Sequence, residues 1–210
     1  MKAVIFDLDG VICSTDDFHY LAWKTLADRE HIYFDREINN LLRGVSRMAS
    51  LEIILRKASK TYTQEEKEEM ATFKNELYKS YLVKMSPKDL SDDVLYTLKT
   101  LKEKGFKIAI GSSSKNTKMI LKQLQIIDMF DAISDGTNIT HSKPDPEVFL
   151  KAAEMLNLDP KECYVVEDAY SGIDAGKAGG FLTFGIGDAS KYDKADYHIN
   201  KLSDLLNIVK

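Results

Sequence analysis

The stretch AVIFDLDG, residues 3–10, decides the fold, because it reads as a buried strand that ends in acidic residues. The run Ala3–Phe6 is apolar and rich in β-branched side chains, which is typical of a strand covered on both faces. Asp7 and Asp9 follow where such a strand opens into a loop, with both side chains on one side. Two neighbouring carboxylates repel each other unless a cation or a shared proton stabilises them, so the pair suggests a Mg²⁺ site with a carboxylate nucleophile. The alternative is that Asp and Gly simply begin a turn.

The chain from Pro87 onward alternates between helical and strand patterns. An expected strand follows each helical stretch. Gly105 is a suitable C-cap for the first helix, and Asp145-Pro146 reads as an N-cap with proline at the first helical position. Such alternation predicts an α/β fold with a parallel sheet and helices on both faces. The strands are expected at Lys107–Gly111, Asp131–Ser134, Cys163–Val166 and Phe181–Gly185, and the helices at Val94–Lys104, Lys115–Gln125, 146–157 and Ser171–Ala178.

The segment from residue 16 to residue 83 reads differently, because every periodic stretch in it is helical. Phe18, Leu21, Ala22 and Leu26, for example, form an i, i+3, i+4, i+8 stripe. The first strand belongs to the later sheet by its character, so the helical segment is expected to be an insertion after it. We therefore predict two domains, a core of residues 1–15 and 84–210 and a helical insert of residues 16–83.

Composition limits the function classes. The chain has 210 residues and a formal net charge of −4, and its basic residues are scattered, which argues against a nucleic-acid or anionic-membrane partner. No apolar run approaches the roughly 18 residues of a membrane span, and no signal peptide is recognisable. Cys13 and Cys163 lack metal-ligand spacing and fit a reducing compartment, so a cytoplasmic location is expected. We also expect a monomer, because no apolar surface stripe is evident.

Polar residues follow four of the expected strands. Ligands of parallel sheets bind at the carboxyl ends of the strands. This rule groups Asp7 and Asp9, the hydroxyl cluster that begins at Ser112, Lys143 and the pair Glu167-Asp168. A divalent cation and a phosphate would neutralise that set.

At these residues the chain resembles the haloacid dehalogenase superfamily of phosphotransferases. The matching motifs are DLDG at Asp7–Gly10, Ser112 after a strand, Lys143 before Pro144, and Glu167-Asp168 after a strand. The resemblance implies a Rossmann-like core with a parallel sheet. The insert resembles the α-helical cap of the β-phosphoglucomutase-like subfamily, and the similar stretches are His19–Ala27, Arg43–Ser50, Phe73–Tyr78 and Ser112–Asn116.

The resemblance implies a role for each acidic residue. Asp7 is the expected nucleophile, which forms an aspartyl phosphate, and Asp9 is the expected general acid and base, in contact with substrate. Mg²⁺ is expected to be held by Asp7, the backbone carbonyl of Asp9, and Asp168, with Glu167 as a ligand or as a support for one.

The same resemblance implies a phosphate-binding role for Ser112 and Lys143. Ser112 is expected to donate a hydrogen bond to the transferring phosphoryl group, and Lys143 supplies a fixed positive charge. A surface lysine before a turn is the alternative for Lys143. A cis bond between Lys143 and Pro144 is also implied.

Transfer between two positions of a sugar needs a second phosphate contact. Arg47 offers a planar fork suited to phosphate, although a solvated arginine at a helix start is the alternative. Further substrate-binding residues are expected on both sides of the sugar: Gly44, Val45, Ser46, Ser50, Ser114, Lys115 and Asn116.

Residues of the first and last helices of the insert complete the expected site. The resemblance implies that His19 and Thr15 help position Asp9. Lys74 and Trp23 are expected to contact substrate, with a surface lysine and a packing tryptophan as the alternatives.

These features predict a magnesium-dependent mutase that acts on sugar phosphates. The resemblance implies that it interconverts β-D-glucose 1-phosphate and glucose 6-phosphate through a phosphoenzyme, with β-glucose 1,6-bisphosphate as intermediate and activator. A sugar-phosphate phosphatase with water as the acceptor is the first alternative. A non-catalytic phosphate-binding module is the second, although binding alone needs neither a nucleophile nor an acid.

Overall fold

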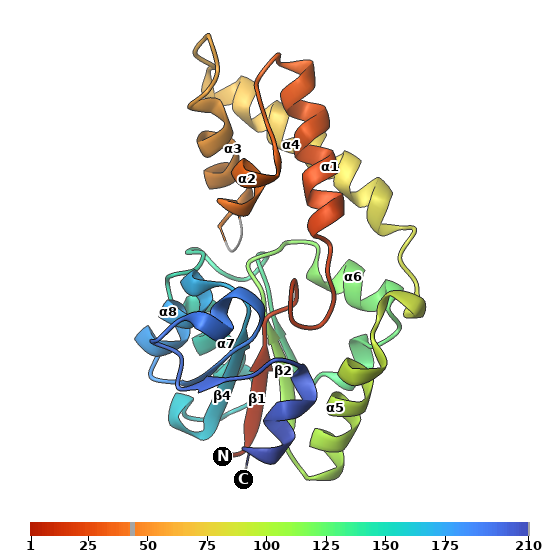
Figure 1. The fold of residues 1–210 in the computed structure, drawn as a ribbon, viewed down its shortest axis with the longest axis vertical. Helices are drawn as coiled ribbons and strands as arrows, with labels where there is room; N and C mark the ends of the chain where they lie inside the picture. The colour runs from red at the N-terminus through yellow and green to blue at the C-terminus, as the bar shows by residue number, and fades with distance from the viewer. Residues whose placement is uncertain (43–44, 210) are drawn as a thin grey trace. The chain divides into compact units, whose positions relative to one another are not determined.

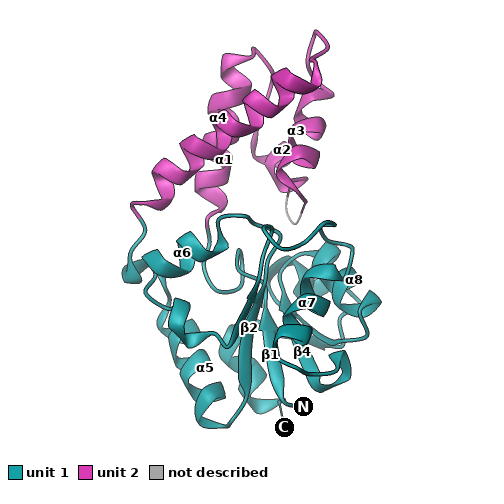
Figure 2. Cartoon of the chain, turned by 180° about the vertical axis from the view of Figure 1, so that it is seen from behind, with its two compact units in different colours: residues 1–14, 85–210 teal, residues 15–84 magenta. Residues whose placement is uncertain are grey.

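The computed structural model describes residues 1–42 and 45–209. Its described residues form two compact units, shown in teal and magenta in Figure 2. The first comprises Met1–Ser14 and Met85–Lys210, and the second comprises Thr15–Lys84. The second unit is therefore inserted into the first, directly after the first strand and its loop. The assignment of these units as a catalytic core and a cap stays a prediction.

The strands of the first unit form one parallel sheet in the order β3-β2-β1-β4-β5-β6, within the described residues. This arrangement confirms the predicted α/β class. Phe6 lies opposite both Ile110 and Val166 in the register, so the residues that follow these three come to one edge of the sheet. The strands are β1 (Ala3–Phe6), β2 (Lys107–Gly111), β3 (Ala132–Ser134), β4 (Cys163–Glu167), β5 (Leu182–Gly185) and β6 (Tyr197–His198).

Helices cover both faces of this sheet, with α5 and α6 on one face and α7 and α8 on the other (Figure 1). All residues of β1 are buried, which explains its unbroken apolar run. Gly111 in β2 lets the Phe149 ring approach, because a Cβ there would lie 2.5 Å from a ring carbon. The α-helices are α5 (Asp92–Glu103), α6 (Thr117–Gln123), α7 (Glu147–Met155) and α8 (Tyr170–Ala178). Short 3-10 helices span Pro87–Asp89, Ile127–Met129, Pro160–Glu162, Gly187–Lys191 and Leu202–Asn207.

All four predicted helix starts of the first unit were wrong by one or two residues. Helix α5 begins at Asp92 rather than Val94, with Ser91 as its N-cap, and α8 begins at Tyr170 rather than Ser171. Helix α6 begins at Thr117 rather than Lys115, because Ser114 Oγ accepts from the Asn116 amide and keeps this stretch in a turn. Helix α7 begins at Glu147, with Pro146 as its N-cap residue. The Asp145 side chain still serves the helix start, because its Oδ1 accepts from the Glu147 amide at 2.9 Å.

The second unit consists of helices around its own apolar core. Thr63 and Glu66 form a reciprocal capping box at the start of the longest helix, which has 19 residues. In the described parts of the chain, no helix combines the length and apolarity needed to cross a membrane. The helices are α1 (Asp16–Arg29), α2 (Arg36–Asn40), α3 (Arg47–Leu55) and α4 (Gln64–Leu82). Their core contains Trp23, Leu26, Phe34, Ile38, Leu51, Ile54 and Met70, among others.

The packing of α5 against the sheet generates a stability prediction. Leu98 is fully buried on this helix. Leu98→Ala should lower the free energy of unfolding by about 2–5 kcal/mol, because it removes buried methyl groups and leaves a cavity. Leu150→Ala is the control, since Leu150 is 38% exposed, and should change stability by no more than about 0.5 kcal/mol. Urea denaturation of both variants makes the comparison, and equal losses would contradict the packing described.

Candidate active site

A buried ion cluster joins the carboxyl ends of β1 and β4. The Lys143 ammonium donates to Asp7 Oδ1 at 2.5 Å and to Glu167 Oε1. Lys143, Asp7 and Glu167 are only 4%, 7% and 1% exposed. Charged side chains this deeply buried are stable only when they are paired and hydrogen-bonded. The positions of the three side chains therefore depend closely on one another. Lys143 is therefore no surface lysine. The Lys143–Pro144 peptide bond is cis, as the resemblance implied.

The charges of this cluster shift one another's protonation. Burial alone lowers the pKa of Lys143, but the charges of Asp7 and Glu167 outweigh it and hold that pKa above its usual value. Burial raises the pKa of Glu167, and the Lys143 charge opposes the rise. For Asp168, burial and then the charges of Glu167 and Asp7 raise the pKa well above its usual value. The positive charge of Lys143 alone therefore does not balance the carboxylates at this edge of the sheet.

The acidic side chains suit a divalent cation. Asp7, Glu167 and Asp168 each offer a carboxylate oxygen, and these oxygens lie within 4.8 Å of one another. Carboxylate oxygens are the ligands that Mg²⁺ prefers, and a cation here would relieve the repulsion that raises the pKa of Asp168. Asp9 was predicted to contribute its backbone carbonyl. Its side-chain charge adds a smaller contribution to the raised pKa of Asp168, after burial and the charges of Glu167 and Asp7.

Two glycines make room for these carboxylates. Gly10 has φ +86°, and a Cβ on it would overlap the Asp168 carboxylate. A Cβ on Gly172 in α8 would overlap the Glu167 carboxylate in the same way. Gly172 was not predicted to have this role. The available signal was a glycine within a helix, which lowers helix stability and calls for a packing reason.

Ser112 lies buried at the end of β2 and begins a tightly bonded turn. Its Oγ accepts from the Ser114 amide at 3.2 Å, and its own amide donates to Ser134 O at 3.1 Å. Ser114 Oγ accepts in turn from the Asn116 amide, while Lys115 is exposed. The turn brings Ser112, Ser114, Lys115 and Asn116 to the same sheet edge as Asp7. Their contact with a phosphate stays a prediction.

A second polar cluster lies within the helical unit. Lys74 is only 2% exposed, and its Nζ lies 2.8 Å from His19 Nδ1. The same Nζ lies 4.8 Å from the centre of the Trp23 ring and 4.5 Å from that of Tyr78. Thr15 Oγ1 and Tyr78 OH share a buried hydrogen bond of 2.7 Å. Tyr78 was not among the predicted residues, although it ends the stretch Phe73–Tyr78 on which the resemblance partly rests.

The protonation of His19 follows from this contact. A lysine ammonium only donates, so His19 Nδ1 must accept and the ring must be neutral. Burial, followed by the charges of Lys74 and Arg47, lowers the pKa of His19 well below its ordinary value. The structure therefore brings His19, Lys74, Trp23 and Thr15 together around Tyr78. Whether they act on Asp9 or on substrate stays a prediction.

Four further predicted residues, Val45, Ser46, Arg47 and Ser50, lie just before or within α3. Ser46 caps this helix by accepting from the Ala49 amide at 3.3 Å, and Val45 precedes it. Arg47 is half-buried, and this burial lowers its pKa. Ser50 is buried. Gly44 lies outside the described residues.

Comparison with known proteins settles the family. A family model of haloacid dehalogenase-like hydrolases matches residues 1–180. The chain belongs to the haloacid dehalogenase-like hydrolase family. The resemblance predicted from the motifs is thereby confirmed, while the roles of the individual site residues stay predictions.

Individual relatives in this family are mutases and phosphatases. The chain is 45% identical over 207 residues to the β-phosphoglucomutase of Bacillus subtilis, which covers 98% of this chain and 92% of the relative. The β-phosphoglucomutase of Clostridium difficile has a solved structure with TM-score 0.92, 38% identity, and coverage of 98% and 93%. A phosphorylated carbohydrates phosphatase of Thermotoga maritima is 29% identical over 86% of this chain and 82% of its own.

The contact between Lys74 and His19 generates a pH prediction. The Lys74 charge disfavours the protonated ring, so Lys74→Met should raise the pKa of His19, which then gains its proton at a higher pH than in the wild type. NMR titration of the His19 ring measures this. Lys67→Met is the matched control on the same helix, because Lys67 pairs with Glu52. An unchanged pKa in Lys74→Met, or equal rises in both variants, would refute the assignment.

Proposed function

We propose that this protein is a β-phosphoglucomutase, which interconverts β-D-glucose 1-phosphate and glucose 6-phosphate. The observation that carries the proposal is the buried Asp7–Lys143–Glu167 cluster at the sheet edge. It combines a carboxylate nucleophile with a fixed cation in a site sheltered from water, which is what phosphoryl transfer requires. The identity of 45% to the Bacillus subtilis enzyme over nearly the whole chain supports a sugar phosphate as the substrate.

The proposed reaction uses two aspartates. A carboxylate oxygen of Asp7 attacks the phosphorus, the bond to the sugar oxygen breaks, and Asp9 gives its proton to that oxygen. In the other half-reaction, Asp9 takes the proton of a sugar hydroxyl, whose oxygen attacks the aspartyl phosphate and releases Asp7.

In the mutase cycle the phosphoenzyme is the starting state, so the attack by the sugar hydroxyl comes first: the 6-hydroxyl of β-glucose 1-phosphate takes the phosphoryl group from Asp7 and forms β-glucose 1,6-bisphosphate. Asp7 then attacks the phosphate at position 1, which releases glucose 6-phosphate and restores the phosphoenzyme. The bisphosphate is also the activator that first phosphorylates Asp7. Lys143 and Ser112 hold the phosphoryl oxygens throughout.

We also propose that the cofactor is Mg²⁺. Asp7, Glu167, Asp168 and the backbone carbonyl of Asp9 would hold it. When bound, Mg²⁺ would neutralise the charge that the carboxylates and the phosphoryl oxygens bring together.

A mutase must also hold the phosphate that is not being transferred. We propose Arg47 for this contact, because its guanidinium can bind phosphate through two parallel hydrogen bonds. Ser114, Lys115 and Asn116 would contact the same phosphate, and Val45, Ser46, Ser50, Trp23 and Lys74 the sugar. A monomeric, cytoplasmic enzyme remains the expectation from the sequence.

A sugar-phosphate phosphatase is the second candidate. The Thermotoga maritima relative carries that activity in its name and covers most of this chain. Asp7 and Asp9 would perform the same attack on the substrate phosphate, and water would replace the sugar hydroxyl in the other half-reaction.

The two candidates differ in their products. With β-glucose 1-phosphate, Mg²⁺ and a trace of β-glucose 1,6-bisphosphate, the wild type should form glucose 6-phosphate much faster than inorganic phosphate. Release of phosphate without glucose 6-phosphate would establish the phosphatase. Asp7→Asn should lower either turnover on the order of 10³-fold or more, with circular dichroism unchanged, because the amide cannot form the phosphoenzyme. Substantial residual turnover in this variant would remove Asp7 from the nucleophile role.

The proposed role of Arg47 is tested separately. Arg47→Ala should lower mutase kcat/KM by about 10- to 100-fold, because it removes a charge-assisted contact. Hydrolysis of a small phosphate monoester, which lacks a second phosphate, should change little. Arg56→Ala is the matched control, since Arg56 is exposed at the other end of α3. Equal losses in both reactions would count against a second phosphate contact.

A further inference from the structure

The ammonium of Lys143 sits on a flexible four-carbon stem, so its position depends on how firmly the backbone beneath it is held. Lys143 lies in the segment between β3 and α7, which has no strand or helix of its own from residue 138 to residue 145. The Phe149 ring supports the head group, with its centre 4.7 Å from Nζ. Some other interaction must therefore hold the loop itself.

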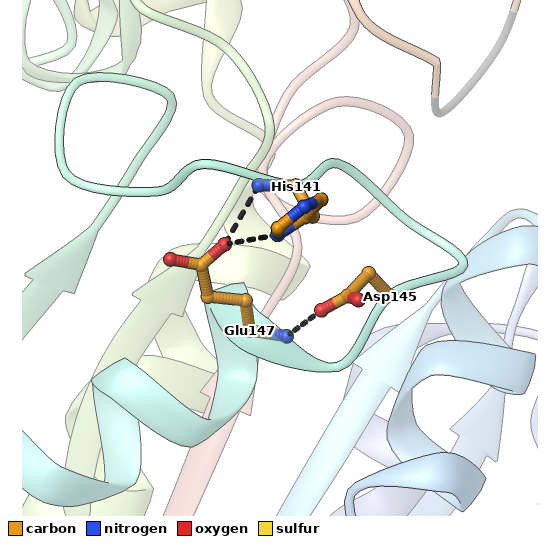
Figure 3. A group of neighbouring side chains, drawn as sticks. All are labelled: His141, Asp145 and Glu147. Atoms are coloured by element: carbon orange, nitrogen blue, oxygen red, sulfur yellow. Dashed lines mark hydrogen bonds and ion pairs between the residues drawn. The ribbon is translucent and has the colours of Figure 1, made fainter.

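The Glu147 carboxylate holds this loop. Its Oε2 accepts hydrogen bonds from the backbone amides of Thr140 at 2.8 Å and His141 at 2.7 Å. His141 Nδ1 lies 3.4 Å from the same oxygen, as the dashed lines of Figure 3 show. The charged acceptor strengthens both backbone bonds. A side chain in the first turn of α7 is thus tied to the start of the loop that carries Lys143.

The other carboxylate oxygen is tied to the body of the helix. Glu147 Oε1 lies 3.0 Å from Lys151 Nζ, one turn further along α7. Lys151 Nζ also donates to the Asn138 carbonyl, at the far end of the same loop. Through these contacts α7 holds the loop at residues 138, 140 and 141. The bonds to His141 and Lys151 hold the pKa of Glu147 down at about 2, so the carboxylate is charged at every pH of interest.

Hydrogen bonds also hold the second half of the loop, which leads into α7. The Asp145 amide donates to Ser142 O at 3.1 Å, and Asp145 Oδ1 accepts from the Glu147 amide at 2.9 Å. His141, Asp145 and Glu147 could geometrically form a cation-binding group. Both oxygens of Glu147 are already engaged by amides and Lys151, so the group acts as a loop anchor.

We propose that Glu147 is a positioning residue for Lys143: its carboxylate fixes the loop of residues 138–147 so that the Lys143 ammonium reaches both Asp7 and Glu167. The part of this inference that concerns turnover rests on the proposed function. The part that concerns the position of Lys143 stands on the contacts above and needs no substrate.

The test compares Glu147→Gln with Glu154→Gln. The amide side chain that Glu147→Gln introduces lacks the charge and cannot accept from two backbone amides while pairing with Lys151, whereas Glu154 is exposed on the same helix. The ¹H–¹⁵N NMR signal of the Lys143 ammonium, assigned with Lys143→Arg, reports its position without substrate. We expect Glu147→Gln to shift or broaden this signal and to lower kcat by about 10- to 100-fold, as a misplaced catalytic group does. KM should change by less than about 3-fold, because binding of the second phosphate is untouched.

A double-mutant cycle separates positioning from a general structural effect. In the Lys143→Arg background, Glu147→Gln should lower kcat by less than about 2-fold further, because the two residues act as one unit. An unchanged Lys143 signal in Glu147→Gln, a matching change in Glu154→Gln, or fully multiplicative losses would overturn the proposal. Should Glu147→Gln fail to fold, Glu147→Asp replaces it, since a side chain shorter by one methylene must also displace the loop. A wild type without mutase turnover would refute the proposed function while the Lys143 signal still decides the role of Glu147.

Discussion

The contact of one buried ammonium with two buried carboxylates is the constraint on which the first unit depends. Lys143, Asp7 and Glu167 come from three separate segments of the chain, and each would be costly to bury alone. The parallel register of β1 and β4 brings the carboxylates to one edge, and the bonded loop before α7 brings the lysine. The backbone of all three segments must therefore be placed so that one atom, Lys143 Nζ, reaches both carboxylates.

The charge at this edge is left unbalanced by the fold. Asp168 and Asp9 add further carboxyl groups beside the cluster, and Gly10 and Gly172 make room for the carboxylates of Asp168 and Glu167. A cation bound at this edge would stabilise the carboxylates. The carboxylates would repel a phosphate unless a cation were bound beside it. The helical unit instead buries a positive charge. The Lys74 ammonium there lies among the rings of His19, Trp23 and Tyr78.

Much of the fold followed from short patterns. The run Ala3–Phe6 and the alternation after Pro87 predicted the parallel sheet, and the rule for strand ends predicted that Asp7, Lys143 and Glu167 lie together. The rest depended on tertiary contacts that no local pattern carries. Lysine is usually exposed, so the burial of Lys74 became visible only once α1 packed on α4. Strand β6 has two residues, too few for a periodic signal. Glu147 looked like an ordinary acidic residue at a helix start, since its bonds to Thr140 and His141 depend on the path of the loop.

The insertion of the helical unit directly after β1 has a consequence for synthesis. A ribosome releases β1 before the strands that pair with it: β2 leaves only after the whole of residues 15–84, and β4 leaves after most of the chain. The helical unit is continuous in sequence and can form from local contacts meanwhile. The strand that precedes Asp7 therefore stays unpaired on both edges until then, and in that state it can pair with other chains. The central strand of the finished sheet is thus the segment of the nascent chain that most needs protection from aggregation.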